Sequence, residues 1–307
     1  MEYPLKVKEL NKSLGKKPII KNMSFQLERG AIYGFLGPNG SGKTTTIRMI
    51  VSLIAPDSGD VEIEGKSVRT NREEALAHIG AIVEDPDLYG YLTGRQNLEH
   101  FARMSATPVS KERIDEVVAL VELEGAMRKK VKSYSLGMKQ RFGIAVSLLH
   151  KPSVLILDEP TNGLDPKGIR DLRHYLQRLA REDGVTLLVS SHQLNEIEML
   201  CDKAIIIKHG EVIEQISMNT AVKEKAATFN IQIEAEPVEQ AKSVLAGFGK
   251  VGEVAGKLEL EKQPYEQIPK LVNALVAAGV NVYGMSYRNR LEDAYFSITE
   301  GQKEDAS

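Results

Sequence analysis

Short apolar runs alternate with helical stripes along the first two thirds of the chain. Residues 5–35 carry brief apolar segments separated by polar turns, which predicts strands with tight connections. The next apolar positions follow a helical spacing and comprise Ile47, Ile50, Val51 and Ile54. Residues 59–68 read as another small β element, and residues 91–150 as an inserted helical region. A β-rich N-terminal part therefore leads into helices.

Two continuous apolar runs, residues 153–160 and 185–191, have the pattern of strands buried on both faces of a parallel sheet. Between them, Asp165 can cap and Pro166 can open a helix. The apolar stripe of that helix consists of Ile169, Leu172, Leu176 and Leu179. Such alternation of strand and helix predicts an α/β fold with a parallel core sheet.

The pattern of apolar and polar residues changes near residue 218. Over residues 229–288 the order is strand, helix, strand, strand, helix, strand, the βαββαβ pattern of ferredoxin-like domains. A final short helix is expected at residues 290–299. We therefore predict two domains, residues 1–217 and a small α+β domain at residues 218–307, and the second carries no recognisable catalytic constellation.

Composition narrows the classes of function. A length of 307 residues suits about two domains. The formal net charge of −2 gives no basic surplus for nucleic-acid phosphates, so a DNA or RNA partner is not expected. No apolar run approaches the roughly 20 residues of a membrane-spanning helix. The single cysteine, Cys201, cannot form an internal disulfide, which agrees with a reducing compartment. We expect a cytosolic chain without a membrane anchor of its own.

The stretch "GPNGSGKTT" fits the phosphate-binding pattern GxxxxGK[ST] between a predicted strand and a predicted helix. Its glycines let backbone N–H groups converge on phosphates at the positive end of the helix. Lys43 adds a cation at the β- and γ-phosphates, and the Thr44 hydroxyl can hold Mg²⁺. The predicted nucleotide-binding residues of this loop are Gly37, Pro38, Asn39, Gly40, Ser41, Gly42, Lys43, Thr44 and Thr45. The alternative is a plain glycine turn before a helix.

Polar side chains end both buried strands. Asp158 closes "LILDEP" and is placed to hold Mg²⁺, while Glu159 beside it can take a proton from an attacking water. His192 closes "VSSH". Because parallel sheets bind ligands at the carboxyl ends of their strands, His192 is expected on the same rim and is a candidate contact of the γ-phosphate. Each signal alone is also compatible with a solvated loop or a structural histidine.

The motifs "GPNGSGKTT", "SYSLGMKQR", "VLILDEP", "GLDP" and "SSH" together resemble those of the ATP-binding cassette (ABC) ATPases, in the same order and spacing over residues 1–217. The resemblance implies a P-loop NTPase cassette with an antiparallel N-terminal β part and a helical insert. It also implies that the signature of one subunit closes over ATP bound to a second subunit. The signature residues expected to act in trans are Ser135, Leu136, Gly137, Met138, Lys139 and Gln140, and the D-loop residues at the dimer interface are Gly163, Leu164 and Asp165.

The chain departs from the family pattern at three places. Leu136 and Met138 stand in the signature where Ser and Gly are commoner. Leu14 occupies the position of the aromatic ring that stacks on adenine, so base binding is expected to be weaker. Glu84 replaces the glutamine of the Q-loop. A carboxylate favours Mg²⁺, so Glu84 joins Thr44 and Asp158 as a predicted metal residue, with a solvent-facing side chain as the alternative.

The resemblance implies an ATPase with ATP and Mg²⁺ as cofactors, Glu159, His192 and Lys43 as catalytic residues, and a second ATP-binding subunit, in a homodimer, as partner. By this resemblance, the ATPase would power separate membrane permease subunits from the cytoplasmic face of the cell membrane. The Glu84 variant resembles cassettes of bacitracin and lantibiotic resistance, which suggests export of, or resistance to, a peptide or antibiotic. The rivals are a cassette ATPase without a transport role and an ATP-driven dimerising sensor without significant hydrolysis.

Overall fold

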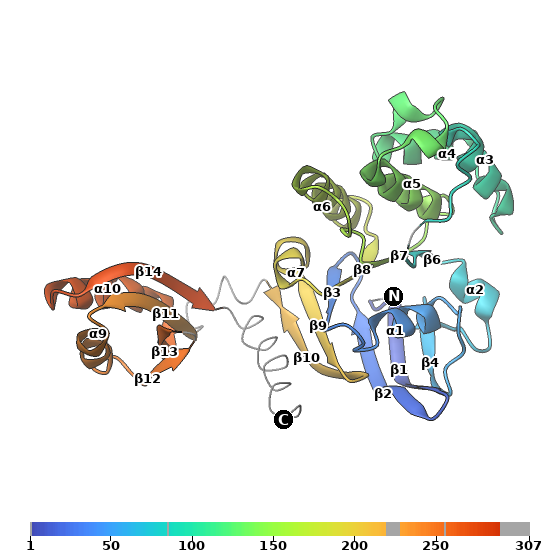
Figure 1. Cartoon of the computed structure of the whole chain (residues 1–307). Helices are drawn as coiled ribbons and strands as arrows, with labels where there is room; N and C mark the ends of the chain where they lie inside the picture. The colour runs from blue at the N-terminus through green and yellow to red at the C-terminus, as the bar shows by residue number, and fades with distance from the viewer. Residues whose placement is uncertain (1, 85, 219–227, 255, 289–307) are drawn as a thin grey trace. The chain divides into compact units, whose positions relative to one another are not determined.

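The computed structural model describes residues 2–84, 86–218, 228–254 and 256–288. The chain divides into two compact units, Met1–Gln215 and Ile216–Ser307 (Figure 1). The helix expected at residues 290–299 lies outside the described residues. In the part of the chain that is described, none of the helices has the length and apolar character that crossing a bilayer requires.

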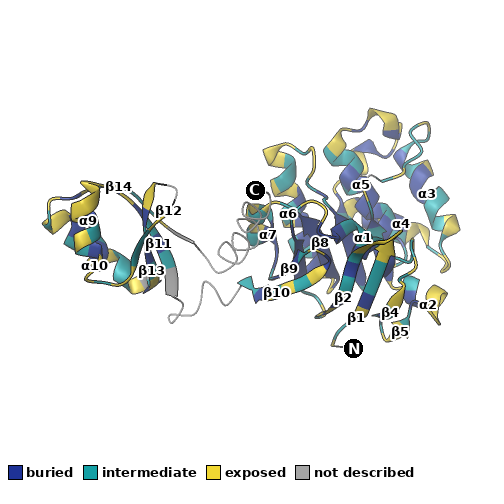
Figure 2. Cartoon of the chain, turned by 60° about the horizontal axis from the view of Figure 1, so that its bottom comes forward, coloured by how far each residue is buried: buried dark blue, intermediate teal, exposed yellow. Residues whose placement is uncertain are grey.

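The first unit is built on a six-stranded sheet with the strand order β10-β9-β3-β8-β7-β6. Its strands are β3 (Ile32–Leu36), β6 (Ile79–Ile82), β7 (Val154–Asp158), β8 (Thr186–Ser191), β9 (Lys203–Lys208) and β10 (Glu211–Ser217). The pairs β3–β8, β3–β9, β6–β7 and β7–β8 are parallel. Every residue of β3, β7 and β8 is buried, and Figure 2 shows the strand cores in dark blue. The two continuous apolar runs are therefore central strands, which confirms the predicted parallel core.

A four-stranded antiparallel sheet, ordered β2-β1-β4-β5, forms the N-terminal layer. It consists of β1 (Leu5–Leu14), β2 (Lys17–Leu27), β4 (Ser58–Ile63) and β5 (Lys66–Ser67). Helix α1 (Lys43–Ile50) packs between this sheet and the core sheet, because its Ile47 and Met49 share one apolar cluster with Leu10 of β1 and Ile156 of β7. This burial fixes the helix that begins directly after the phosphate-binding loop.

Helices α3 (Gly94–Met104), α4 (Lys111–Leu120) and α5 (Leu136–Leu148) gather as the inserted region, away from the antiparallel sheet (Figure 1). Helices α6 (Pro166–Arg181) and α7 (Leu194–Leu200) contact the core sheet at β8, and α7 also contacts β3. Asp165 caps α6 by accepting the Gly168 N–H at 2.9 Å, and Pro166 occupies its first turn, as the sequence predicts.

Two local features differ from the sequence-based expectation. Helix α1 ends at Ile50, so Ile54 lies beyond it, because Ser52 adopts a left-handed backbone with φ of +57°. Helix α2 (Arg72–Leu76) and strand β6 were not anticipated. Only four residues long, β6 lies at the edge of the sheet, where too few positions are available to establish a period.

The second unit contains a four-stranded antiparallel sheet in the order β12-β13-β11-β14. Its elements are β11 (Thr228–Glu236), α9 (Val238–Leu245), β12 (Val251–Val254), β13 (Lys257–Pro264), α10 (Ile268–Ala277) and β14 (Asn281–Arg288). Ile231 and Ile233 of β11 pack with Leu245 of α9 and with Leu271 and Leu275 of α10. The unit thus has an apolar core of its own between one sheet face and two helices.

Candidate functional site

The loop from Gly37 to Gly42 connects β3 to α1 at the carboxyl end of the core sheet. A side chain at Gly37 would meet the Ile207 carbonyl at 2.5 Å and Ser41 Oγ at 2.6 Å, so the close approach requires glycine. Gly40 and Gly42 adopt positive φ angles of +79° and +107°, which glycine tolerates at low cost. The buried Ser41 hydroxyl has no hydrogen-bond partner among the described residues. The loop is a backbone cradle at a helix N-terminus, where N–H groups favour anions.

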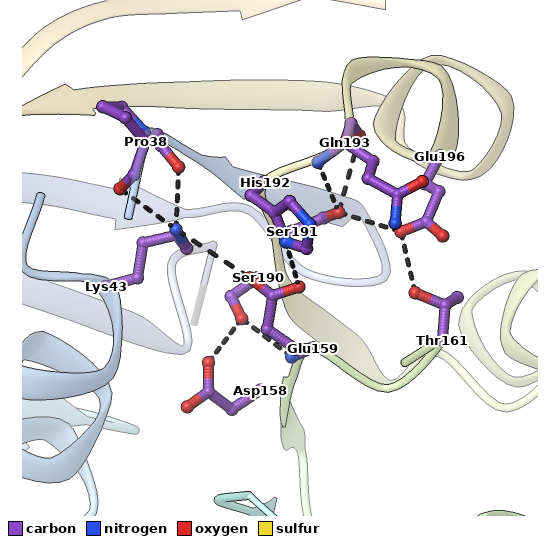
Figure 3. A network of polar contacts seen from close by, with 11 residues as sticks. Pro38, Lys43, Asp158, Glu159, Thr161, Ser190, Ser191, His192, Gln193 and Glu196 are labelled. Carbon is purple, nitrogen blue, oxygen red and sulfur yellow. Dashed lines mark hydrogen bonds and ion pairs between the residues drawn. The ribbon is translucent and has the colours of Figure 1, made fainter. Parts of the chain in front are cut away.

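Lys43 is the cation of this cradle, with only 6% of its surface exposed. Its Nζ donates to the Gly37 carbonyl at 2.7 Å and lies 3.8 Å from Glu159 Oε1. Burial lowers the pKa of the Lys43 ammonium, and the neighbouring carboxylates of Glu159 and Asp158 oppose that shift. The ammonium is therefore held among loop carbonyls and carboxylates within reach of the cradle (Figure 3).

Asp158 ends β7 and is 5% exposed. Its Oδ1 accepts a hydrogen bond from Ser190 Oγ at 2.5 Å, and the same Ser190 oxygen accepts the Glu159 N–H at 2.9 Å. Glu159 has a left-handed backbone with φ of +50°, a conformation that costs roughly 1–3 kcal/mol for a residue with a side chain. Ser190 thus joins β8 to both carboxylate residues and supports a strained backbone.

Glu159 and His192 lie side by side across the ends of β7 and β8. His192 Nδ1 is 2.9 Å from Glu159 Oε2, and the other carboxylate oxygen faces Lys43. The Glu159 side chain is 19% exposed and that of His192 39% exposed. The predicted catalytic residues Lys43, Glu159 and His192 are therefore in contact range, and both Glu159 and His192 remain accessible to solvent.

A cleft of about 560 Å³ opens over these groups. Its volume falls in the range typical of small-molecule sites. The predicted site residues that line it are Leu14, Asn39, Gly40, Gly42, Lys43, Thr44, Thr45, Glu159 and His192. Leu14, one of these lining residues, is 56% exposed and offers an apolar side chain without an aromatic face. Asp158 does not line the cleft and lies buried at the end of β7.

The structure does not place Glu84 at this cleft. Its carboxylate pairs with the Arg48 guanidinium of α1, and 65% of its side chain is exposed. Glu84 also has a left-handed backbone, with φ of +67°. Of the three predicted metal residues, only Thr44 lines the cleft and Asp158 ends the strand beside it. The described residues contain no cluster of three or more His, Cys, Asp or Glu side chains able to hold a metal ion.

The signature residues form a separate surface. Ser135 caps α5, and its hydroxyl accepts the Met138 N–H at 3.3 Å. Several signature residues line a second cleft of about 390 Å³ together with the predicted D-loop residues Gly163, Leu164 and Asp165. They are Ser135, Leu136, Gly137, Met138 and Gln140. No signature residue is among the described residues that line the first cleft. Lys139 lines neither cleft.

Sequence reasoning missed several residues of the site. Ser190 lies two positions before His192 in the stretch "VSSH", and only its proximity to Asp158 across the sheet reveals its contacts. Glu196 accepts hydrogen bonds from Thr161, in the loop after β7, and from Ser191, the last residue of β8. Asn162 lines the first cleft. The residue types carry no signal that would identify these roles without the fold.

Comparisons with known proteins give one consistent result. A family profile described as ABC transporter matches residues 20–162. The uncharacterized ABC transporter ATP-binding protein YhcH of Bacillus subtilis (strain 168) is 44% identical over 307 residues, which cover 99% of this chain and 99% of YhcH. The bacitracin transport ATP-binding protein BcrA of Bacillus licheniformis is 45% identical over 233 residues, 76% of either chain.

Solved structures of ATP-binding cassettes are also similar to this chain. CbiO1 from Clostridium perfringens, described as part of the ABC transporter complex cbiONQ, has a TM-score of 0.66 and 29% identity, over 73% of this chain and 92% of that one. A dimeric, post-hydrolysis state of the ATP-binding cassette MJ0796, bound to ADP and Pi, has a TM-score of 0.62 and 28% identity, over 70% of this chain and 98% of that one.

Proposed function

Since the chain belongs to the family of ABC transporter ATP-binding proteins, we propose that two copies of it close over two ATP molecules and power a separate membrane permease. The chain is the ATP-binding and ATP-hydrolysing subunit of an ABC transporter. The observation that supports the ATP-hydrolysing role is the convergence of Lys43, Glu159 and His192 at one cleft.

In the proposed mechanism, ATP lies with its phosphates in the cradle of residues 37–45, and Leu14 contacts the base. Lys43 stabilises the charge of the β- and γ-phosphates. Glu159 takes the proton of the attacking water, and His192, 2.9 Å from its carboxylate, contacts the γ-phosphate. A dimerising sensor without hydrolysis would have no need for this accessible pair of acid–base groups.

Mg²⁺ fits the donors present in the proposed site. The buried Asp158 carboxylate offers hard oxygen ligands, and Thr44, which carries a hydroxyl, lines the cleft. Mg²⁺ is commonly bound through one or two carboxylates together with substrate phosphates, so a full protein cage is not required. The bound ion would neutralise the charge that develops on the phosphates. Glu84 would contribute only after its ion pair with Arg48 opens.

The second copy supplies the signature in this proposal. Two observations support it. The signature residues line a cleft separate from the one around Lys43, and residues of the predicted D-loop line this second cleft as well. The MJ0796 cassette was solved as a dimer. In the homodimer, Ser135 and the Gly137 backbone, at the start of α5, would donate hydrogen bonds to the partner's γ-phosphate.

The unit after residue 217 is proposed to be a separate accessory domain of the ferredoxin-like type. Its βαββαβ order and its strand order β12-β13-β11-β14 support this assignment. The domain from residue 1 to 217, with its helical insert at residues 91–150, would be the cassette itself. It would lie in the cytoplasm and reach the inner face of the membrane through the permease.

Relatives suggest the class of transported molecule. They include BcrA, named for bacitracin transport, SrtF of Streptococcus pyogenes, named for lantibiotic transport, and LnrL of Bacillus subtilis, named for linearmycin resistance. We propose that the transporter exports a peptide or antibiotic of this kind or protects against it. Deleting the gene should then lower the inhibitory concentration of at least one of these compounds, and expression of a Lys43→Ala chain should not restore it.

The proposed ATPase site is tested by phosphate release from the purified chain with Mg²⁺ and ATP. Wild type should hydrolyse ATP, and Lys43→Ala should lose both ATP binding and turnover. Lys111→Ala removes an exposed lysine at the start of α4 and offers a matched charge change outside both clefts. Equal ATP affinity of Lys43→Ala and wild type would contradict the assignment of the cradle.

A further inference from the structure

Glu196 accepts hydrogen bonds from two separate segments at once, the loop after β7 and the last residue of β8. Its Oε2 accepts from Thr161 Oγ1 at 2.7 Å and from Ser191 Oγ at 2.8 Å (Figure 3). Thr161 follows Glu159 by two positions, and Ser191 directly precedes His192. One carboxylate oxygen therefore joins the loop after β7 to the end of β8.

Together with the contact between His192 and Glu159, these hydrogen bonds form a closed ring of contacts around the two proposed catalytic residues. Ser191 Oγ also accepts the Gln193 N–H at 2.9 Å, so Gln193, on the other side of His192, is linked to the Glu196 carboxylate through Ser191. On the opposite side of the ring, His192 Nδ1 lies 2.9 Å from Glu159 Oε2. A displacement of the Glu196 carboxylate would therefore shift both members of the pair relative to each other.

The position of Glu196 in its own helix does not account for these contacts. Glu196 lies in the first turn of α7, where an acidic residue commonly serves the N–H groups and dipole of that helix. Here both hydrogen bonds come from side chains of other segments. A cavity of about 100 Å³ lies beside the three groups, lined by Thr161, Ser191, Glu196, Val189 of β8 and side chains of α6 and α7 that are mostly apolar but include Arg173 and Asn195. Loss of the carboxylate would leave the two loops room to move.

We infer that Glu196 is a positioning residue for hydrolysis: it holds the loops of Glu159 and His192 at the separation that lets them act on one phosphate and one water. The inference rests on the proposed roles of those two residues. Glu196 itself is not among the described residues that line the cleft.

The test compares Glu196→Ala and Glu196→Gln in steady-state ATP hydrolysis. Because small misplacements of catalytic groups cost up to about 100-fold in rate, Glu196→Ala should lower kcat by about 10- to 100-fold. KM and ATP affinity should remain unchanged, since the cradle is intact. Glu196→Gln keeps an oxygen acceptor of the same reach and should restore most of the rate. Glu198→Ala, the same charge change on the same helix, should retain wild-type kcat.

A double-mutant cycle makes the test independent of any single variant. Thr161→Val and Ser191→Ala each remove one donor, so each should lower kcat, and either change should have little further effect in the Glu196→Ala background. Additive losses would overturn the inference, as would wild-type kcat in Glu196→Ala, or an equal loss in Glu196→Gln and Glu196→Ala. If Glu196→Ala fails to fold, the Glu196→Gln, Thr161→Val and Ser191→Ala chains decide the question.

Glu159→Gln in the same assay separates the two claims. If Glu159→Gln is inactive and Glu196→Ala is fully active, the positioning role alone is wrong. If Glu159→Gln keeps wild-type turnover, the proposed catalytic base is wrong, whatever the behaviour of Glu196.

Discussion

The surface around Lys43 and the surface around Ser135 belong to the same compact unit, yet their polar groups are arranged in opposite ways. Lys43 is buried and bonded to the Gly37 carbonyl, with Glu159 beside it. Ser135 is exposed, and its hydroxyl accepts the Met138 N–H in the first turn of its own helix. The first surface is formed within one chain by four segments that are distant in sequence: residues 14–19, residues 39–45, residues 159–162 and His192. The second lies at the start of α5, and under the proposed function its helix-start N–H groups would serve the phosphate of a second copy.

The largest effect should follow a change at the first surface. Glu159→Gln removes a general base while the cradle remains, so ATP hydrolysis should fall by at least about 100-fold with little loss of ATP affinity. ATP-bound dimers should accumulate, because hydrolysis opens the proposed sandwich. Phosphate release and size-exclusion chromatography with ATP measure the two outcomes. Glu182→Gln, an exposed glutamate at the end of α6, is the control, and near-normal turnover of Glu159→Gln would disprove the base assignment.

A smaller but still large effect should follow a change at the second surface. A Cβ added at Gly137 would meet Leu164 Cδ2 at 3.6 Å, an ordinary van der Waals contact, so Gly137→Glu is expected to leave the isolated chain folded. The added carboxylate would repel the partner's phosphate, and hydrolysis should fall by about 10- to 100-fold. ATP affinity of the monomer should not change.

The control for this second variant is Gly125→Glu. It places the same group in the helical insert, where nothing lies within 4 Å of the added Cβ. Its hydrolysis rate should equal that of wild type. If Gly137→Glu instead weakens ATP binding to the monomer, the second surface acts on the chain's own nucleotide.

The smallest effect is expected at Glu84, which lies outside both surfaces. If binding of Mg²⁺ and ATP opened the Glu84–Arg48 pair, the Glu84 carboxylate would favour the metal and would repel the phosphate when the metal is absent. The ATPase rate of wild type should therefore depend more steeply on Mg²⁺ than that of Glu84→Gln, with rates differing by a few-fold at limiting metal. Glu74→Gln, in an exposed pair with Lys66, is the control. Superimposable curves for wild type and Glu84→Gln would show that Glu84 is not a metal residue.

Sequence patterns located the parts of the site that depend on local backbone. The position of the cradle between β3 and α1 and that of Asp158 at the end of β7 were both predictable. A glycine loop and the end of a buried strand are each encoded by neighbouring residues. The Asp165 cap of α6 was predictable for the same reason. These features need only a few consecutive positions and no knowledge of distant contacts.

The contacts that orient the site could not be predicted in this way. Ser190 reaches Asp158 across 32 positions of sequence, and Thr161 reaches Glu196 across 35. The pairing of Glu84 with Arg48 likewise depends on α1 lying beside the Q-loop, which the charge of either residue does not reveal. Serine, threonine and glutamate are common surface residues, so their roles emerge only when the strands are placed side by side.

The central claim, that the two surfaces meet only between two copies of the chain, is tested most directly by mixing two inactive variants. Glu159→Gln has an intact signature, and Gly137→Glu has an intact cradle and base. A mixed dimer would contain one fully wild-type composite site, so an equimolar mixture should regain about a quarter of the wild-type ATPase rate. If the mixture hydrolyses ATP no faster than the sum of the two variants measured separately, the signature does not act in trans and the account is wrong.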